Sequence, residues 1–178
     1  GDITYDELSE MTFHDFIKEH FNLEVDGNEW MNEYRSYFGE AHQLLPGVED
    51  TLRFAKKQGY KLTVLSNGEK FMQRHRLELA GIKDYFDLIV TSEEAHYSKP
   101  DPHAFDYFFS RTEIGPNETL FFGDGLQSDI LGAEKYGFDS IWYNHRHRKD
   151  TIGLHPLFEV ETYPEFVKIM QNDFQKAY

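Results

Sequence analysis

The stretch that decides the fold is TLFFGDGLQSDILGAEKYG, residues 119–137. It opens with a short apolar run, 119–123, bounded by turn residues, which is the pattern of a buried strand. Helical periodicity follows over 127–136, and a glycine stands where helices commonly end in a left-handed residue. The stretch therefore predicts a strand, a turn and a helix, with Asp124 directly after the strand and Asp129 in the first helical turn.

The same unit recurs on both sides of this stretch. Apolar runs bounded by turn residues predict strands at 61–66, 88–92, 119–123 and 140–144. Helical periods predict helices at 48–58, 69–80, 102–112 and 127–136, and a last helix after Pro164 with Phe166, Ile169, Met170 and Phe174 as its apolar stripe. This alternation indicates an α/β fold, a Rossmann-like parallel sheet with helices on both faces.

The chain before residue 46 has a different rhythm. Apolar side chains recur at helical steps in two sections, first Leu8, Phe13, Phe16, Ile17 and Phe21, then Trp30, Met31, Tyr34, Tyr37 and Phe38. That spacing predicts two amphipathic helices. The aromatic residues of the second section are predicted to be buried, with stacking on a nucleobase as the alternative. Because Pro46-Gly47 closes the section, we expect a helical part over 1–45 and an α/β part over 46–178.

Composition excludes several classes of function. The 32 acidic and 18 basic side chains give a formal net charge of -14, which repels a phosphate backbone, so we expect no nucleic-acid partner. The chain has no cysteine, which rules out disulfides, zinc–thiolate sites and thiol catalysis. No apolar run reaches the roughly 18 residues of a membrane span, and the first residues lack the pattern of an export signal. We therefore expect a cytoplasmic protein without a membrane partner.

Polar side chains stand at the carboxyl ends of the predicted strands, where ligands bind in sheets of this kind. Ser66, Asn67 and Gly68 follow the first strand and offer a hydroxyl, an amide and a flexible backbone to phosphate oxygens. Lys99 lies in a Ser-Lys-Pro turn, where the proline excludes helical geometry. Each signal alone has an ordinary interpretation, as a turn or a solvated side chain. The His/Arg run at 145–148 is predicted to be a solvated loop, with substrate contact as the alternative.

Asp124 and Asp129 form a further signal. Two carboxylates delivered to one pocket repel each other unless a cation neutralises them, and oxygen ligands favour Mg²⁺. The alternative is a turn residue followed by a first-turn charge that the helix dipole favours. A hydroxyl, an ammonium and a carboxylate pair at successive strand ends together predict a pocket for a phosphoryl group and Mg²⁺, with both aspartates as metal ligands.

The order of these motifs resembles the haloacid dehalogenase (HAD) superfamily of hydrolases. Three stretches of this chain look like the second, third and fourth motifs of that superfamily: a strand followed by Ser-Asn-Gly, then Ser-Lys-Pro, then FFGDGLQSD. The likeness covers nearly the whole chain. The two leading helices and SDILGAEKYGFDSIWYNHRHR look like the group with a helical cap inserted after the first strand, which implies a partial cap over 1–45 and a core over 46–178. The strand at 141–144 and the His/Arg run after it resemble pyrimidine 5'-nucleotidases.

The resemblance implies a Mg²⁺-dependent phosphohydrolase that acts on a small phosphorylated metabolite such as a nucleoside monophosphate. Ser66, helped by Asn67 and Gly68, would bind the transferring phosphoryl group, and Lys99 would neutralise the nucleophile and the phosphoryl oxygens. Asp124 would ligate Mg²⁺ directly. Asp129 would act through a metal-bound water or by orienting the lysine.

The superfamily's first motif, an apolar strand followed by Asp-x-Asp, is absent from this sequence. Asp2 and Asp6 follow no apolar run, so we expect the nucleophile that forms the aspartyl-phosphate to lie in a segment ahead of Gly1, and the chain alone to be inactive. In the superfamily this strand lies at the centre of the sheet, between the strands ending at Ser66 and Asp124. Its loss would leave two strand edges unpaired. A strand donated by another chain is the second possibility.

Three other functions compete with this interpretation. Receiver domains of response regulators combine carboxylates, a hydroxyl and a lysine, but there the acidic pair comes first and the lysine last. A haloacid dehalogenase shares the architecture and works without magnesium, whereas the acidic pair here favours a metal-using phosphatase. A catalytically inactive binding or scaffold protein fits the absence of a nucleophile.

Overall fold

A computed structural model of the chain describes residues 14–40 and 42–172. Predictions at several positions lie outside the described residues: Asp2, Asp6, Leu8, Phe13, Phe174 and the side chains of Tyr34 and Phe38. A compact first unit ends at His42 and a second begins at Gln43. Their interpretation as a partial cap over 1–45 and a core over 46–178 stays a prediction.

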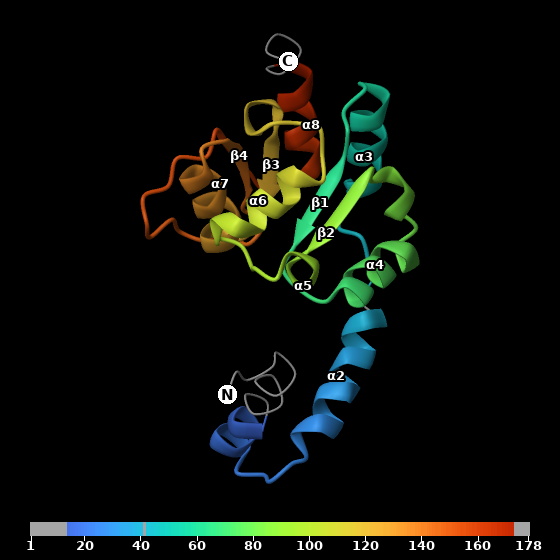
Figure 1. Cartoon of the computed structure of the whole chain (residues 1–178), viewed down its shortest axis with the longest axis vertical. Helices are drawn as coiled ribbons and strands as arrows, with labels where there is room; N and C mark the ends of the chain where they lie inside the picture. Colours follow the sequence, from blue (N-terminus) through green and yellow to red (C-terminus); the bar gives the residue numbers. More distant parts are fainter. Residues whose placement is uncertain (1–13, 41, 173–178) are drawn as a thin grey trace. The chain divides into compact units, whose positions relative to one another are not determined.

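The first unit contains helical residues 14–21 and helix α2 (Gly27–Glu40), drawn in blue in Figure 1. Asp26 stabilises the start of α2, because its carboxylate accepts a hydrogen bond of 2.9 Å from the backbone N–H of Asn28. Ile17 and Met31 are buried, whereas Trp30 and Tyr37 are 40% and 71% exposed. The prediction that these two aromatic residues are buried was therefore wrong for the unit taken by itself.

The second unit alternates strands and helices (Figure 1). The strands are β1 (Thr63–Ser66), β2 (Leu88–Thr91), β3 (Leu120–Gly123), β4 (Asp139–Tyr143) and β5 (Phe158–Val160). The α-helices are α3 (Val48–Lys57), α4 (Lys70–Leu79), α5 (Ser92–Ala95), α6 (Pro102–Ser110), α7 (Leu131–Tyr136) and α8 (Tyr163–Asn172). The described residues of this unit also form two 3₁₀ turns, η1 (Lys83–Tyr85) and η2 (Pro116–Glu118), and one π-helical turn, η3 (Leu126–Ile130).

The strands form two separate sheets within the described residues. β1 pairs with β2, and β3, β4 and β5 pair in that order. Every pairing is parallel, with Thr63 opposite Leu88 in the first sheet and Leu120 opposite Asp139 in the second. The predicted α/β architecture with parallel strands is confirmed.

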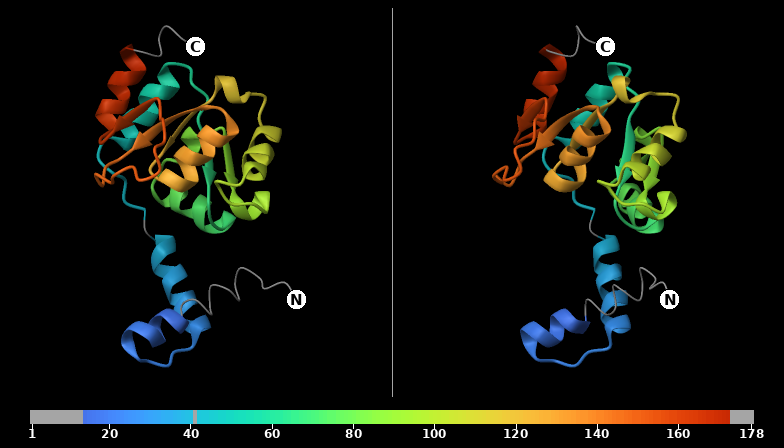
Figure 2. Two further views of the ribbon diagram at one scale, coloured as in Figure 1. Left: turned by 90° about the vertical axis from the view of Figure 1, so that its left-hand side faces the viewer. Right: turned by 60° about the vertical axis from the view of Figure 1, so that its left-hand side comes forward.

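Apolar cores lie on both faces of the strands. Neighbouring residues of β3 divide between them, as alternation along a strand requires: Phe121 packs in one core and Phe122 in the other. The core of Phe122 includes residues of α3 and α8, which lie side by side in Figure 2, and the core of Phe121 includes residues of α6 and α7. Helices on both faces were predicted, and this is confirmed. The carboxyl ends of β1 and β3 are thereby presented beyond the packed layers.

Candidate functional site

The Lys99 side chain connects the carboxyl ends of β1 and β3. Its Nζ donates a hydrogen bond of 2.7 Å to the backbone oxygen of Leu65 and one of 2.8 Å to Oδ1 of Asp129. The lysine and aspartate side chains are only 9% and 10% exposed, so this ion pair is largely removed from solvent. The ammonium also lies 5.2 Å from the centre of the Phe121 ring. Two residues predicted to be functional therefore contact each other directly.

The buried carboxylate of Asp129 is held by the turn η3 that carries it. Oδ2 accepts a hydrogen bond of 2.9 Å from the N–H of Gly125, and the Asp129 N–H donates to the Gly125 oxygen at 2.7 Å. A Cβ placed on Gly123 would lie 2.5 Å from the same Oδ2. Glycine at 123 is therefore required for the close approach of this carboxylate, a role that sequence reasoning missed although two glycines flanking Asp124 were a visible signal.

Asn67 joins the Lys99 turn to the end of β1. Its side-chain amide donates to the Lys99 oxygen at 3.0 Å, and its side-chain oxygen accepts from the Lys99 N–H at 2.8 Å. The N–H of Gly68, at φ 140°, donates to Oγ of Ser92 at 2.9 Å. The Ser66 hydroxyl makes only a 3.5 Å contact with the Asn67 oxygen. The Asn67 side chain thus positions the Lys99 turn, and the Ser66 hydroxyl is the group best able to form a hydrogen bond with a ligand.

Asp124 is exposed at the end of β3, and its carboxylate forms no hydrogen bond or ion pair with the described residues. Its backbone oxygen accepts a hydrogen bond of 3.4 Å from Trp142 Nε1. Burial raises the pKa of Tyr163 to about 12, and the charges of Tyr143 and Asp124 add to this effect. The pKa of Tyr143 is also raised, first by burial and then by Asp124. The Asp124 carboxylate therefore helps to raise the pKa of both tyrosines, and it lies where it can still bind a ligand.

Few side chains in the part of the chain that the structure describes are placed to ligate a cation. No group of three histidine, aspartate or glutamate side chains converges there. Both carboxylate oxygens of Asp129 are engaged, by Lys99 and by Gly125. Asp124 keeps both oxygens available. Because Mg²⁺ is often held by one or two carboxylates together with phosphate oxygens and water, Asp124 fits as one ligand of such a site.

The His/Arg run lies in a turn that is closed by Asn144. This buried side chain accepts from the N–H of Arg148 at 2.7 Å and donates to the Arg148 oxygen at 2.9 Å and to Glu159 at 2.6 Å. His147 pairs with Glu161 at 3.0 Å, and His145 stacks on Tyr143. Residues 146–148 are exposed, as expected for a solvated loop.

The structure brings Lys99 into direct contact with both Asn67 and Asp129, and the Lys99 ammonium also bonds the Leu65 oxygen on β1. Ser66 and Asp124 occupy the carboxyl ends of β1 and β3, the two strands that this contact connects. The catalytic, phosphate-binding and metal-binding roles of these residues stay predictions. None of the described helices is both long and apolar enough to cross a membrane.

Comparison with known proteins identifies the family. Residues 5–137 match a family model described as haloacid dehalogenase-like hydrolase. The HAD-hydrolase YfnB of Bacillus subtilis is 30% identical over 171 residues, which is 96% of this chain and 72% of that protein. Pyrimidine 5'-nucleotidase PynA of Streptococcus pneumoniae is 30% identical, covering 86% of this chain, and pyrimidine 5'-nucleotidase YjjG of Escherichia coli is 32% identical, covering 83%. The chain spans slightly less than two thirds of these nucleotidases, 65% and 66%.

Solved structures agree with this assignment. A crystal structure of YfnB bound to magnesium covers 94% of this chain and 73% of its own, with a TM-score of 0.85 at 30% identity. A dehalogenase superposes with a TM-score of 0.80 at 20% identity, over 94% of this chain and 73% of its own, which supports the fold alone. The chain belongs to the haloacid dehalogenase-like hydrolase family.

Proposed function

We propose that this chain is most of a Mg²⁺-dependent phosphohydrolase that works through an aspartyl-phosphate, whose nucleophile lies in a segment outside these 178 residues. The observation that carries the proposal is the Lys99 ammonium, held between the Leu65 oxygen and the Asp129 carboxylate where β1 and β3 end. An ammonium fixed in this way can offset the charge of a nucleophilic carboxylate and of phosphoryl oxygens without reorganising during the reaction. The chain alone is expected to be inactive.

The other strand-end residues are assigned supporting roles. Ser66 would donate its hydroxyl to the transferring phosphoryl group, because that hydroxyl makes only a long contact of 3.5 Å. Asn67 would fix Lys99 through its two backbone hydrogen bonds, and the backbone around Gly68 would complete the phosphate site. Asp129 would orient the lysine. These assignments use hydrogen bonding and fixed charge, which dominate catalysis of phosphoryl transfer.

Asp124 would be the protein ligand for Mg²⁺ in the described residues, since its carboxylate is exposed and free of other partners. Asp129 would act on the metal through water, because both its oxygens are already bonded. When bound, Mg²⁺ would offset the charge of the phosphate oxygens. The magnesium-bound structure of YfnB supports this choice of cation.

The proposed substrate is a nucleoside monophosphate. The names of PynA and YjjG, both pyrimidine 5'-nucleotidases, support this choice. A further relative is a phosphoserine phosphatase of Thermus thermophilus, which is 32% identical over 119 residues, or 67% of this chain. A small phosphorylated metabolite is therefore the wider class. The predicted compartment is the cytoplasm.

The test compares the 178-residue chain with a longer chain that carries the natural upstream sequence, on a panel of nucleoside monophosphates. We expect phosphate release from the longer chain only, and its loss with EDTA or with Asp124→Asn. Asp50→Asn is the matched control, since Asp50 is an exposed residue of α3 whose carboxylate contacts Arg53 at 3.4 Å. If the longer chain releases no phosphate, this result would contradict the phosphatase proposal and favour the scaffold alternative.

The haloacid dehalogenase alternative is tested in the same assay. Halide release from a 2-haloacid that persists in EDTA would replace the phosphatase proposal. The structural likeness to dehalogenases at 18% to 22% identity does not favour it, because likeness at that level carries the fold and no specificity.

A further inference from the structure

The turn after β1 contains a reactive dipeptide, Asn67-Gly68, which is the only place in the sequence where glycine follows asparagine. Asparagine is a thermally labile residue, because a backbone nitrogen can attack its side-chain amide. Glycine in the next position favours this attack, since it has no Cβ to hinder the approach of its nitrogen. The Asn67 side chain is exposed, so water reaches it. This residue is therefore chemically suited to deamidation.

The reaction joins the Gly68 nitrogen to the side chain before it. The nitrogen gives up its proton and attacks Cγ of Asn67; the N–Cγ bond forms, the Cγ–Nδ2 bond breaks, and ammonia leaves with the proton. The product is a cyclic succinimide, which water opens. Hydrolysis at Cγ gives aspartate, and hydrolysis at the backbone carbonyl gives isoaspartate, in which the main chain runs through the side-chain carbons. Water is the only co-reactant.

The folded turn holds both reacting groups. The Asn67 amide donates to the Lys99 oxygen at 3.0 Å and accepts from the Lys99 N–H at 2.8 Å. The Gly68 N–H donates to Oγ of Ser92 at 2.9 Å. For the attack, the amide must leave Lys99 and rotate toward Gly68, and the Gly68 N–H must leave the serine. Deamidation therefore requires a state in which this turn has opened.

Helix α5 holds the backbone on the other side of Gly68. The N–H of Lys70 donates to the Glu93 carboxylate at 2.6 Å, and the Gly68 oxygen accepts from the Glu93 N–H and from the Ser92 hydroxyl at 3.5 Å each. A capping box fixes the start of α5. Loss of the Ser92 hydroxyl alone would therefore free the nucleophile while Glu93 still holds the turn.

The products cannot restore the original contacts. An aspartate at position 67 offers no donor to the Lys99 oxygen, which the amide now meets at 3.0 Å. Isoaspartate lengthens the main chain beside Gly68 as well. Because ammonia is lost, neither product returns to asparagine, and the Lys99 turn stays weakened.

We propose that Asn67-Gly68 is a site of spontaneous deamidation, which Lys99 and Ser92 keep closed in the folded chain and which local opening of the turn converts irreversibly. The modification rests on the geometry of the turn. Only its effect on turnover rests on the proposed function, in which Asn67 fixes Lys99: phosphate release should fall in step with conversion.

Conversion is followed in the 178-residue chain, kept in mildly alkaline buffer, through the mass of the tryptic peptide 62–70. Isomerisation at Asp26-Gly27 or Asp124-Gly125 leaves the mass unchanged and does not interfere. We expect conversion to be at least about tenfold slower in the folded chain than in guanidinium chloride. Equal rates would mean that the turn gives no protection, and no conversion in the unfolded chain would mean that the dipeptide is inert; either result overturns the proposal.

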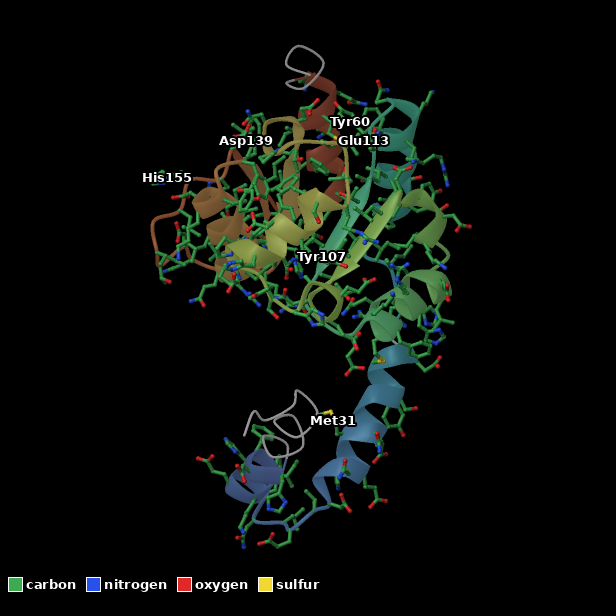
Figure 3. The ribbon with its side chains drawn as sticks, in the orientation of Figure 1. Met31, Tyr60, Tyr107, Glu113, Asp139 and His155 are labelled. Carbon is green, nitrogen blue, oxygen red and sulfur yellow. The ribbon has the colours of Figure 1, made fainter. Side chains whose placement is uncertain are left out.

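Ser92 is tested by its own variants. Ser92→Ala frees the Gly68 N–H and should accelerate conversion by about two- to tenfold, whereas Ser92→Thr keeps a hydroxyl and should leave the rate unchanged. Ser110→Ala is the matched control, since the Ser110 hydroxyl bonds the oxygen of Tyr107, labelled on α6 in Figure 3. An unchanged rate in Ser92→Ala, or equal acceleration in Ser110→Ala, would overturn the role of Ser92.

Urea below the unfolding transition separates local opening from global unfolding, both in the original chain and in Ser92→Ala. Opening of one turn exposes little surface, so the conversion rate should hardly change with urea there. A rate that rises as steeply as the unfolded fraction would show that conversion needs global unfolding, and it would overturn the local opening.

Turnover is scored apart from the modification. In the longer chain we expect phosphate release to fall in step with conversion, and Asn67→Asp to show the same loss; full release after complete conversion would overturn the effect on turnover. A longer chain that never releases phosphate, in which position 67 still converts, would remove the proposed function and leave the modification site. Phosphate release from a chain that never converts would do the reverse.

Discussion

At the scale of single residues, the side chains of Lys99 and Asp129 form an ion pair that is largely buried. We predict that Asp129→Asn lowers the free energy of unfolding by about 3–5 kcal/mol, because it leaves a largely buried ammonium without its counter-charge. An asparagine whose oxygen accepts the Gly125 N–H turns its NH2 group toward the Lys99 ammonium, so the change removes both the counter-charge and the hydrogen bond of Lys99. Urea titration followed by circular dichroism measures the effect.

The matched control for this change is Glu78→Gln, which removes the partner of Lys83 in an exposed ion pair. Exposed pairs contribute little, so the unfolding midpoint should hardly move. Equal losses in the two variants would mean that solvent reaches the Lys99 contact freely.

Gly123 offers a second test at this scale. We predict that Gly123→Ala destabilises the fold by about 1–3 kcal/mol, since its methyl group would lie 2.5 Å from Oδ2 of Asp129 and must displace it. Gly115→Ala is the control, because a Cβ there meets only Glu118, at 3.7 Å. Thermal unfolding of both variants checks the difference, and an unchanged Gly123→Ala midpoint would show that Asp129 moves aside without cost.

The candidate residues could be named from the sequence because parallel strands bring their carboxyl ends to one edge of a sheet: Ser66 ends β1, Asp124 directly follows β3, and Lys99 lies in the connection after β2. The partner of Asn67 was not predictable. Its amide bonds the backbone of Lys99, 32 residues further along the chain, and no local pattern records such a pairing. The direct contact between Lys99 and Asp129 was foreseen as one of two roles for the aspartate.

At the scale of elements, the predicted strands and helices of the second unit are all present, with ends shifted by a few residues. The predicted helix over 127–136 begins instead as the π-turn η3, in which the Ile130 N–H donates at 3.2 Å to the Gly125 oxygen five residues back. β5 was missed, since three residues at 158–160 are too few to show a period. α5 was missed as well; it is fixed by a capping box between Thr91 and Glu94.

The turn after β4 depends on one side chain, which gives a prediction for an element. Asn144→Ala removes two donated bonds and one accepted bond from a buried position, and we expect a loss of about 1–3 kcal/mol. Amide exchange at Arg148 should also accelerate, because its N–H loses its acceptor. His147→Ala, at an exposed position in the same turn, should change neither quantity; similar exchange in both variants would contradict the role of Asn144.

At the scale of the whole molecule, the two sheets of the second unit line a shared cavity of about 480 Å³, whose walls include residues 61–65 and 119–122. The sequence could indicate such a cavity only through a family resemblance, because a cavity has no residues of its own.

A larger side chain on the cavity wall tests whether this space is open. Ala55 is buried and lines the cavity, so Ala55→Leu should raise the free energy of unfolding of the chain by about 0.5–2 kcal/mol. Ala133 is also buried, in the opposite core, and is not part of the cavity lining, so Ala133→Leu should overpack its site and lower stability by about 1–3 kcal/mol. Urea titrations of the two variants compare the same added atoms in opposite surroundings. If both substitutions destabilise the chain alike, the space beside Ala55 cannot hold a larger side chain.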